Sequence, residues 1–283
     1  MSTVPYPPQR QLSVGEVLDL TFRIYRATFV KCLSFATCGV IAGQLASIYA
    51  LVKGRSLAQT QGWAGMAGMI AAMQDRAFDA LYVVGLVLTL LFYAAVLFRQ
   101  RAMITDGAVG GELAAALRRT PALVGLLILI GLACLASFVP ALVTSGTLRV
   151  LLIVAALLVL CYGLVAISCA TTVLLVEATG PAASLARSWQ LTSGSFWRLS
   201  LIYTVALIIL FALEIVIATV AGFLAGALAH GDLAMVTAFA EVIGIVLGAL
   251  VTPFYGALAL AILADLKVRK EGADLAQRIS ATA

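Results

Sequence analysis

The sequence predicts an all-α integral membrane protein with six transmembrane helices in three hairpins, and three observations lead to this prediction. Of the 283 residues, 63% are apolar, and the mean hydropathy is +1.10. Charged residues make up 11% of the chain, which is less than half of the ~25% typical of soluble domains. Six apolar runs also reach the ~20 residues that a helix needs to cross a bilayer. Most of this chain is therefore expected to lie in lipid rather than in water.

The six runs leave connecting segments whose charge alternates along the chain. We place the spans at Phe29–Val52, Asp79–Phe98, Pro121–Thr144, Val150–Leu175, Leu199–Ala227 and Ala234–Ala264. Of the 18 basic residues, 14 fall in the segments 1–31, 99–120, 177–198 and 265–283. Because basic residues concentrate in cytoplasmic segments, both termini are expected in the cytoplasm. The chain is then one membrane domain with a flexible tail at 1–12, an external segment at 54–76 and a second tail at 265–283.

A short amphipathic helix is expected on the cytoplasmic surface before each hairpin. In the first, over residues 13–28, Ser13 and Glu16 have the spacing of a capping box, and apolar residues recur on one helical face. Such a helix lies in the plane of the membrane interface. The other two are placed at 111–119, ending at Thr120-Pro121, and at 180–194.

The composition argues against nucleic-acid binding, metal chemistry and nucleophilic catalysis. The net charge is +5, but the basic residues lie between apolar runs, where they orient membrane helices and attract anionic lipids. The five cysteines lie inside apolar runs without a close pair, and His230 is the single histidine, whereas zinc sites need Cys and His ligands in close pairs. No nucleophile motif or phosphate-binding glycine loop is present. We therefore expect no enzyme activity, no cofactor, no metal and no nucleic-acid partner.

Two acids inside the spans mark a candidate intramembrane polar site. Glu214 lies near the middle of the fifth span, and Glu241 lies about two turns inside the sixth. Acids at this depth are candidates for function by default. The other members of the candidate site are Tyr203, Thr252 and Tyr255. The two glutamates either ionise with the help of water, a cation or a lipid headgroup, or stay protonated and donate hydrogen bonds between helices.

Small residues near these acids predict how the fifth and sixth spans pack. They recur at helical spacing as Ala218, Gly222 and Gly226 on the fifth span and as Gly244 and Gly248 on the sixth. Rows of small residues let helices approach closely. We therefore expect a close antiparallel hairpin in which Glu214 and Glu241 each face small residues of the other helix.

A second candidate site is a cytoplasmic patch for anionic lipid headgroups. Its members are Arg118, Arg119, Arg187, Trp189, Trp197 and Arg198. Each basic residue near an anionic surface contributes about 1 kcal/mol of attraction, and tryptophan is enriched at the headgroup level. The alternative is that these cations only orient the protein. The first amphipathic helix is also expected to pack near segment 265–274, with Glu16 and Asp19 beside Lys267 and Arg269.

Three segments carry a family resemblance. The first reads Gly-Glu-Val-Leu-Asp from Gly15, the second Ala-Arg-Ser-Trp-Gln-Leu-Thr from Ala186, and the third Asp-Leu-Lys-Val-Arg-Lys-Glu-Gly from Asp265. Together they resemble the bacterial six-helix family named for the glycerophosphoryl diester phosphodiesterase membrane domain and the related YciC-like proteins. The chain departs from that pattern at Ala264 and Ala273, where the family has aromatic residues.

The resemblance implies a six-helix membrane protein, and stand-alone members of the family mostly have no assigned activity. The single histidine does not supply the metal site that a phosphodiesterase needs. We therefore expect a non-enzymatic integral protein of a bacterial inner membrane. Its expected partners are membrane lipids and either other membrane proteins or further copies of itself, in envelope maintenance or assembly.

The alternative is a proton- or cation-coupled transporter of a small molecule or lipid that uses Glu214 and Glu241. Broken helices and a continuous polar cavity that reaches Glu214 would favour transport. A dry core with lipid in side grooves would favour the first hypothesis. A lipid-modifying enzyme is a third and less supported class.

Overall fold

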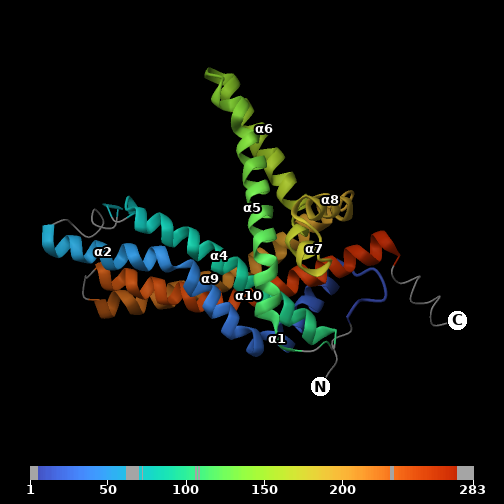
Figure 1. Cartoon of the computed structure of the whole chain (residues 1–283), viewed down its shortest axis with the longest axis horizontal. Helices are drawn as coiled ribbons and strands as arrows, with labels where there is room; N and C mark the ends of the chain where they lie inside the picture. The colour runs from blue at the N-terminus through green and yellow to red at the C-terminus, as the bar shows by residue number, and fades with distance from the viewer. Residues whose placement is uncertain are drawn as a thin grey trace.

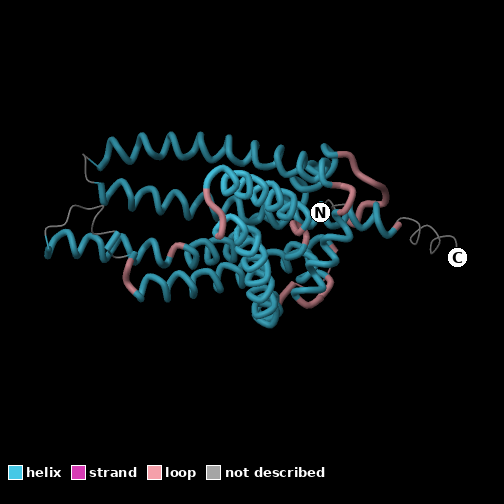
Figure 2. Tube along the Cα trace, turned by 90° about the horizontal axis from the view of Figure 1, so that it is seen from above, coloured by secondary structure: helices cyan, strands magenta, loops and turns pink. Residues whose placement is uncertain are grey.

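The computed structural model describes residues 6–61, 70–71, 73–105, 107, 109–229 and 233–272, and its regular elements there are all α-helices (Figure 2). They are α1 (Val14–Gly43), α2 (Leu45–Gln61), α4 (Arg76–Ile104), α5 (Glu112–Leu142), α6 (Gly146–Ala166), α7 (Ala170–Val176), α8 (Pro181–Thr192), α9 (Phe196–Ala229) and α10 (Leu233–Glu271). Residues 62–69 and 72 of the predicted external segment 54–76, the loop at His230 and the end of the predicted tail 265–283 lie outside the described residues.

Six helical segments are long and apolar enough to cross a membrane. They are Val14–Gly43, Arg76–Ile104, Glu112–Leu142, Gly146–Val176, Phe196–Leu224 and Ala238–Glu271. The prediction of an all-α, multi-pass membrane protein with six apolar spans is therefore confirmed at the level of helix length and composition.

Helix α1 joins the predicted amphipathic helix to the first span without a break. The capping box at its start is confirmed, since the Ser13 hydroxyl accepts from the Glu16 N–H at 3.3 Å and the Glu16 carboxylate accepts from the Ser13 N–H at 2.7 Å. The buried face continues along the helix from Val17 through Thr28 to Ala42, so no turn separates a surface helix from a spanning one. The predicted span Phe29–Val52 is divided instead at Gln44, where α1 ends and α2 begins.

Helix α5 passes through Thr120-Pro121, so the predicted stop at this point is wrong. Proline has no N–H to donate, but its fixed φ angle is compatible with a helix. The Thr120 hydroxyl donates to the Ala116 carbonyl at 2.9 Å within the same helix. Segment 111–119 is therefore the start of α5 rather than a separate helix.

The predicted span Val150–Leu175 is broken near one end, between α6 and α7. The free carbonyl at the end of α6, that of Ala166, accepts hydrogen bonds from the Ser188 hydroxyl at 2.9 Å and the Thr192 hydroxyl at 2.8 Å. Both donors belong to α8, the helix expected at 180–194. Hydroxyl donors from α8 thus satisfy the backbone that the break leaves without a partner.

The helices form a bundle and an arm (Figure 1). Helices α1, α2, α4, α9 and α10 run roughly along the long axis of the molecule, whereas α5 and the returning α6 leave this bundle at a steep angle. The Arg99 guanidinium on α4 holds the root of the arm by donating to Glu112 at 3.0 and 3.2 Å. If the long axis of the bundle is parallel to the bilayer normal, then α5 and α6 are steeply inclined to that normal.

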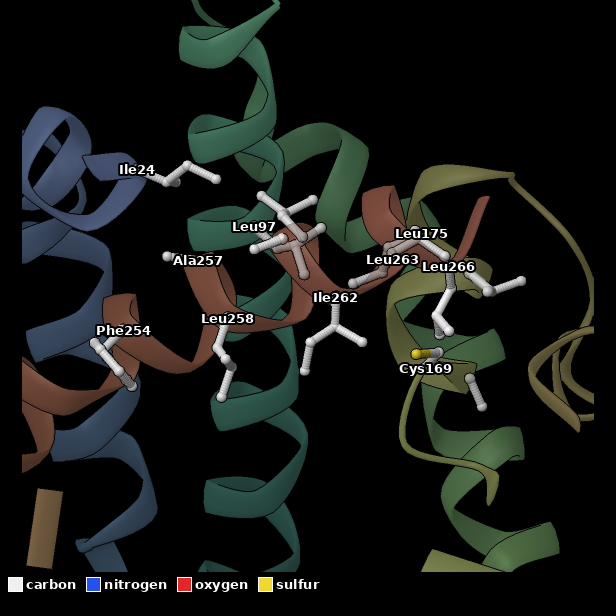
Figure 3. Packing of buried hydrophobic residues seen from close by; sticks show 14 of the residues in the cluster. Ile24, Leu97, Cys169, Leu175, Phe254, Ala257, Leu258, Ile262, Leu263 and Leu266 are labelled. Carbon is white, nitrogen blue, oxygen red and sulfur yellow. The ribbon is translucent and has the colours of Figure 1, made fainter. Parts of the chain in front are cut away.

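The buried core lies where α10 crosses α1, α4 and α7 (Figure 3). Its labelled members are Ile24, Leu97, Cys169, Leu175, Phe254, Ala257, Leu258, Ile262, Leu263 and Leu266. Gln100 is also fully buried there and donates to the Pro253 carbonyl at 2.7 Å and to the Thr28 hydroxyl at 3.3 Å. This amide joins α1, α4 and α10 at one point.

Helices α1 and α4 approach each other closely, whereas two predicted contact glycines of α9 have no close neighbour among the described residues. A Cβ on Gly85 would stand 2.4 Å from the Ala42 carbonyl oxygen, and the Thr89 hydroxyl donates to the Gly39 carbonyl at 3.0 Å. In contrast, a Cβ on Gly222 or Gly226 of α9 would meet no heavy atom of the described structure within 4 Å. Gly222 and Gly226 therefore do not make the predicted close contact with the described residues of α10.

Gly248 of α10 packs on a different helix from the one predicted. A Cβ at this position would stand 2.9 Å from both methyl carbons of Val40 in α1. The glycine face of α10 is thus occupied by α1, and this leaves α9 to contact another face of α10. The prediction that Glu214 faces the small residues Gly244 and Gly248 of α10 is wrong for this reason, since both glycines point toward residues that precede α9, namely Gln44 and Val40.

Candidate functional site

Two of the predicted intramembrane residues, Glu214 and Tyr255, line an open groove between α9 and α10. The groove has a volume of about 380 Å³, and its lining residues are Thr204, Leu207, Ile208, Leu210, Phe211, Glu214 and Tyr255. We name it the Glu214 groove. Leu207, Ile208 and Phe211 are exposed at its walls, so the groove opens on the side of the bundle rather than into its core.

Glu214 is half-buried in this groove. Within the described part of the chain, its carboxylate forms no hydrogen bond and no ion pair. Phe211 precedes it by almost one helical turn on α9, and Tyr255 reaches the groove from α10. The expected hydrogen bond from Glu214 to α10 is therefore absent from the described residues.

A second groove of about 180 Å³ adjoins the first at Tyr255. It lies between α1, α4 and α10 and is lined by Phe35, Ala36, Gly39, Val40, Thr89, Leu90, Tyr93, Thr252 and Tyr255. The Thr252 hydroxyl donates to the Gly248 carbonyl at 2.7 Å, and the Thr89 hydroxyl is likewise engaged with Gly39. Because both threonine hydroxyls already have partners and most other lining side chains are apolar, this groove presents mainly apolar surface. We name it the Thr252 groove.

Two predicted members of the site lie elsewhere. Glu241 lines neither groove, and it precedes Tyr255 by a length of α10 that amounts to about 21 Å. Tyr203 packs against the buried core near Ser168 and Cys169, at the break between α6 and α7. The structure thus brings together Glu214, Thr252 and Tyr255 but not Glu241 or Tyr203.

Asp265 is the centre of a buried ion cluster at the end of the bundle where the first described residues meet the end of α10. Its side chain is 1% exposed and accepts from the Leu12 N–H at 2.8 Å, from Arg198 and from Arg269. Arg198 also donates to the Leu12 carbonyl at 2.6 Å. Leu12, just before the predicted helix 13–28, therefore binds the start of segment 265–274, whereas the packing of that helix itself against the segment stays a prediction.

The other expected charge partners differ from the prediction. Glu16 pairs with Arg10, and Lys267 pairs with Glu177 at 2.7 Å. Arg187 binds Glu271 and also Glu177, the latter at 3.5 Å. Charge pairs at this end of the bundle thus connect α8 and the α7–α8 loop to α10.

Because of such contacts, fewer arginines of the expected headgroup patch are available to bind lipid. Arg187 and Arg198 are engaged by acids of the protein, and Arg119 donates to the Ala178 carbonyl at 3.1 Å. Arg118 is exposed and has no partner among the described residues. Trp189 and Trp197 are 48% and 83% exposed, as expected for rings at the headgroup level.

Sequence reasoning missed other free cations and an aromatic cluster. The side chains of Arg23, Arg26 and Lys31 are exposed on α1 and have no partner among the described residues. Tyr162 stacks on Phe196 with ring centroids 5.0 Å apart and meets Trp189 edge-on at 5.7 Å. The helical spacing of Arg23 and Arg26 was a usable signal, whereas the cluster depends on the tertiary contact of α6 with α8 and α9.

At the other end of the bundle, Asp75 joins α2 to α4. Its carboxylate accepts from Lys53, from the Tyr49 hydroxyl at 2.7 Å and from the Ala77 N–H at 3.2 Å. The Lys53 ammonium, the Tyr49 hydroxyl and this N–H hold the pKa of Asp75 well below its usual range. Among the described residues, no three His, Cys, Asp or Glu side chains are grouped so that they could hold a metal ion.

Comparison with known proteins does not extend these observations. No protein-family model matches the chain, and no curated protein or solved structure is detectably similar to it. The resemblance of three segments to the glycerophosphoryl diester phosphodiesterase membrane domain therefore stays a prediction. The second and third segments meet at the ion pair of Arg187 with Glu271. Leu12, which precedes the first segment, and Arg198, which follows the second, both bind Asp265 of the third.

Proposed function

We propose that this protein is a non-enzymatic integral protein of a bacterial inner membrane that binds lipids in grooves on its side. The observation that carries the proposal is the pair of adjoining grooves, of about 380 and 180 Å³, which share Tyr255 and are lined mainly by apolar side chains. Acyl chains fill such surfaces in a membrane. A role in envelope maintenance or assembly fits a protein that associates with lipids or with other membrane proteins.

The proposed orientation has both termini in the cytoplasm and three membrane hairpins. It is supported by the 14 of 18 basic residues that fall on this side in a six-span arrangement. The exposed cations Arg23, Arg26, Lys31 and Arg118 lie on the same side, where anionic headgroups attract them. Trp189 and Trp197 belong to the same proposed interface.

Lipid extraction after purification tests this function. The protein is purified in a mild detergent from a bacterial membrane, and bound phospholipid is measured by native mass spectrometry. We expect phospholipid to remain bound to the parent and to decrease when Ala36→Phe or Leu207→Trp fills the Thr252 or the Glu214 groove. Lipid retention that is the same in the parent and both variants would contradict the proposal.

The second candidate is the proton- or cation-coupled transporter, and two observations favour it. Glu214 has no polar partner among the described residues, and carboxylates of this kind serve proton and cation pathways. The break between α6 and α7 is a second feature typical of transporters. Substrate-induced proton movement in proteoliposomes, abolished in Glu214→Gln, would decide for transport.

A further inference from the structure

We infer that the Glu214 groove binds an amphiphile that carries a protonated amine on an apolar chain. The inference deepens the proposed function, because it names a ligand class for one of the two lipid-facing grooves. It rests on three features of the groove, which are an unpaired carboxylate, two aromatic rings beside it and an apolar channel along α9.

The carboxylate supplies the charge that selects an amine. Glu214 has no hydrogen bond or ion pair within the described residues, and an ionised carboxylate in apolar surroundings is strongly destabilised unless it is paired. An ammonium group donates charge-assisted hydrogen bonds to a carboxylate, and these are roughly twice as strong as neutral ones. A ligand that brings an ammonium group therefore satisfies the group that the protein leaves unsatisfied.

Two aromatic rings lie where the ammonium group would bind. Phe211 is 63% exposed and Tyr255 is 41% exposed, and both line the groove with Glu214. The faces of such rings attract cations. A carboxylate that shares a groove with two accessible aromatic rings recognises an ammonium group better than it recognises a neutral hydroxyl.

The rest of the groove suits an alkyl chain. From Glu214 the lining follows α9 past Leu207 to Thr204, a distance of about 15 Å along the helix. The volume of about 380 Å³ falls in the range of ~300–1,000 Å³ typical of small-molecule sites. The occupant that fits all three features is an elongated primary amine.

The second intramembrane glutamate provides a matched control. Glu241 is also half-buried in an apolar helix, but it lines neither groove. If membrane depth alone attracted amines, both glutamates would contribute to binding. If the groove is the site, Glu214 alone contributes.

Binding of dodecylamine to the full chain in phosphatidylcholine nanodiscs tests the inference. The bound fraction is measured at pH 7 by equilibrium dialysis with radiolabelled amine, and the partition into empty nanodiscs is subtracted. We expect saturable binding to the parent, about tenfold to a hundredfold weaker binding to Glu214→Gln, and unchanged binding to Glu241→Gln. Dodecanol should bind weakly and equally to all three proteins.

Three results would overturn the inference. The first is that the parent and Glu214→Gln bind dodecylamine with equal affinity, and the second is that the parent binds dodecylamine and dodecanol with equal affinity. The third is that Leu207→Trp still binds the amine fully, although the larger side chain at this exposed position fills the groove. Thermal unfolding of each variant shows whether it is folded. Phospholipid retention measured on the same samples separates the two proposals, because it tests lipid association whether or not the amine binds.

Discussion

The substitution Gly256→Ala is expected to destabilise the crossing of α1, α4 and α10. A Cβ at this position would stand 2.4 Å from Oε1 of Gln100 and 3.3 Å from its Cδ. Gln100 is fully buried, and its amide nitrogen already donates to the Pro253 carbonyl and the Thr28 hydroxyl. The side chain has no free direction in which to move without losing these bonds.

The expected loss follows from two costs and one gain. Overpacking a buried site costs ~1–3 kcal/mol, and leaving a buried amide without its partner costs a further ~1–3 kcal/mol. Replacing glycine by alanine inside a helix returns up to ~1 kcal/mol. We therefore expect Gly256→Ala to lower the free energy of unfolding by about 3 kcal/mol.

Thermal unfolding in a single detergent measures this effect. Gly222→Ala is the matched control, because a Cβ there meets no heavy atom of the described structure within 4 Å, and it should leave the unfolding temperature unchanged or slightly raised. The double variant with Gln100→Ala removes the clashing atom, so Gly256→Ala should cost little on that background. If Gly256→Ala is as stable as the parent, or if its cost is the same with and without Gln100, the reasoning is wrong.

Three further predictions concern the two ends of the bundle and the arm. Asp265→Asn leaves two arginines without their buried acid and should cost ~3 kcal/mol, with faster proteolysis near Leu12 as the measurement; unchanged proteolysis would contradict it. The Asp75–Lys53 pair stabilises the fold fully above the usual carboxyl pKa of ~4 and loses this effect as pH falls towards the lower pKa of folded Asp75. The difference in stability between parent and Asp75→Asn should therefore shrink below pH ~4, and a constant difference would refute this. A cysteine at Ser145, at the tip of the arm, should react with an impermeant maleimide from outside intact cells, whereas labelling only after lysis would contradict the six-span orientation.

The sequence alone determined the class of protein and the approximate position of each apolar helix. This was possible because lipid imposes a simple requirement, namely a run of apolar residues long enough to cross the hydrocarbon with its own backbone bonded. Local signals were equally direct at the start of α1, where Ser13 and Glu16 form the expected capping box. They failed at Pro121, because the fixed φ angle of proline allows a helix to continue as well as to begin.

The sequence also identified Glu214 and Tyr255 as candidates, but only the tertiary structure decided that they share a groove. A helical pattern states which residues lie on one face of a helix, and it does not state which neighbour covers that face. The small-residue face of α10 was covered by Val40 of α1, and this displaced the expected contact with α9. The same limit explains why Glu214 and Glu241, the two acids inside these apolar helices, differ in their surroundings.

The charged residues show the same division. Their number and placement predicted an orientation in the membrane, since that depends on which segments carry the basic residues. Which of them face lipid depends on the partners that folding brings to them. Asp265 and Glu271 engage Arg198 and Arg187, whereas Arg118 keeps no partner among the described residues. A cation is free for a headgroup only where no acid from another helix reaches it, and that is a property of the packed structure.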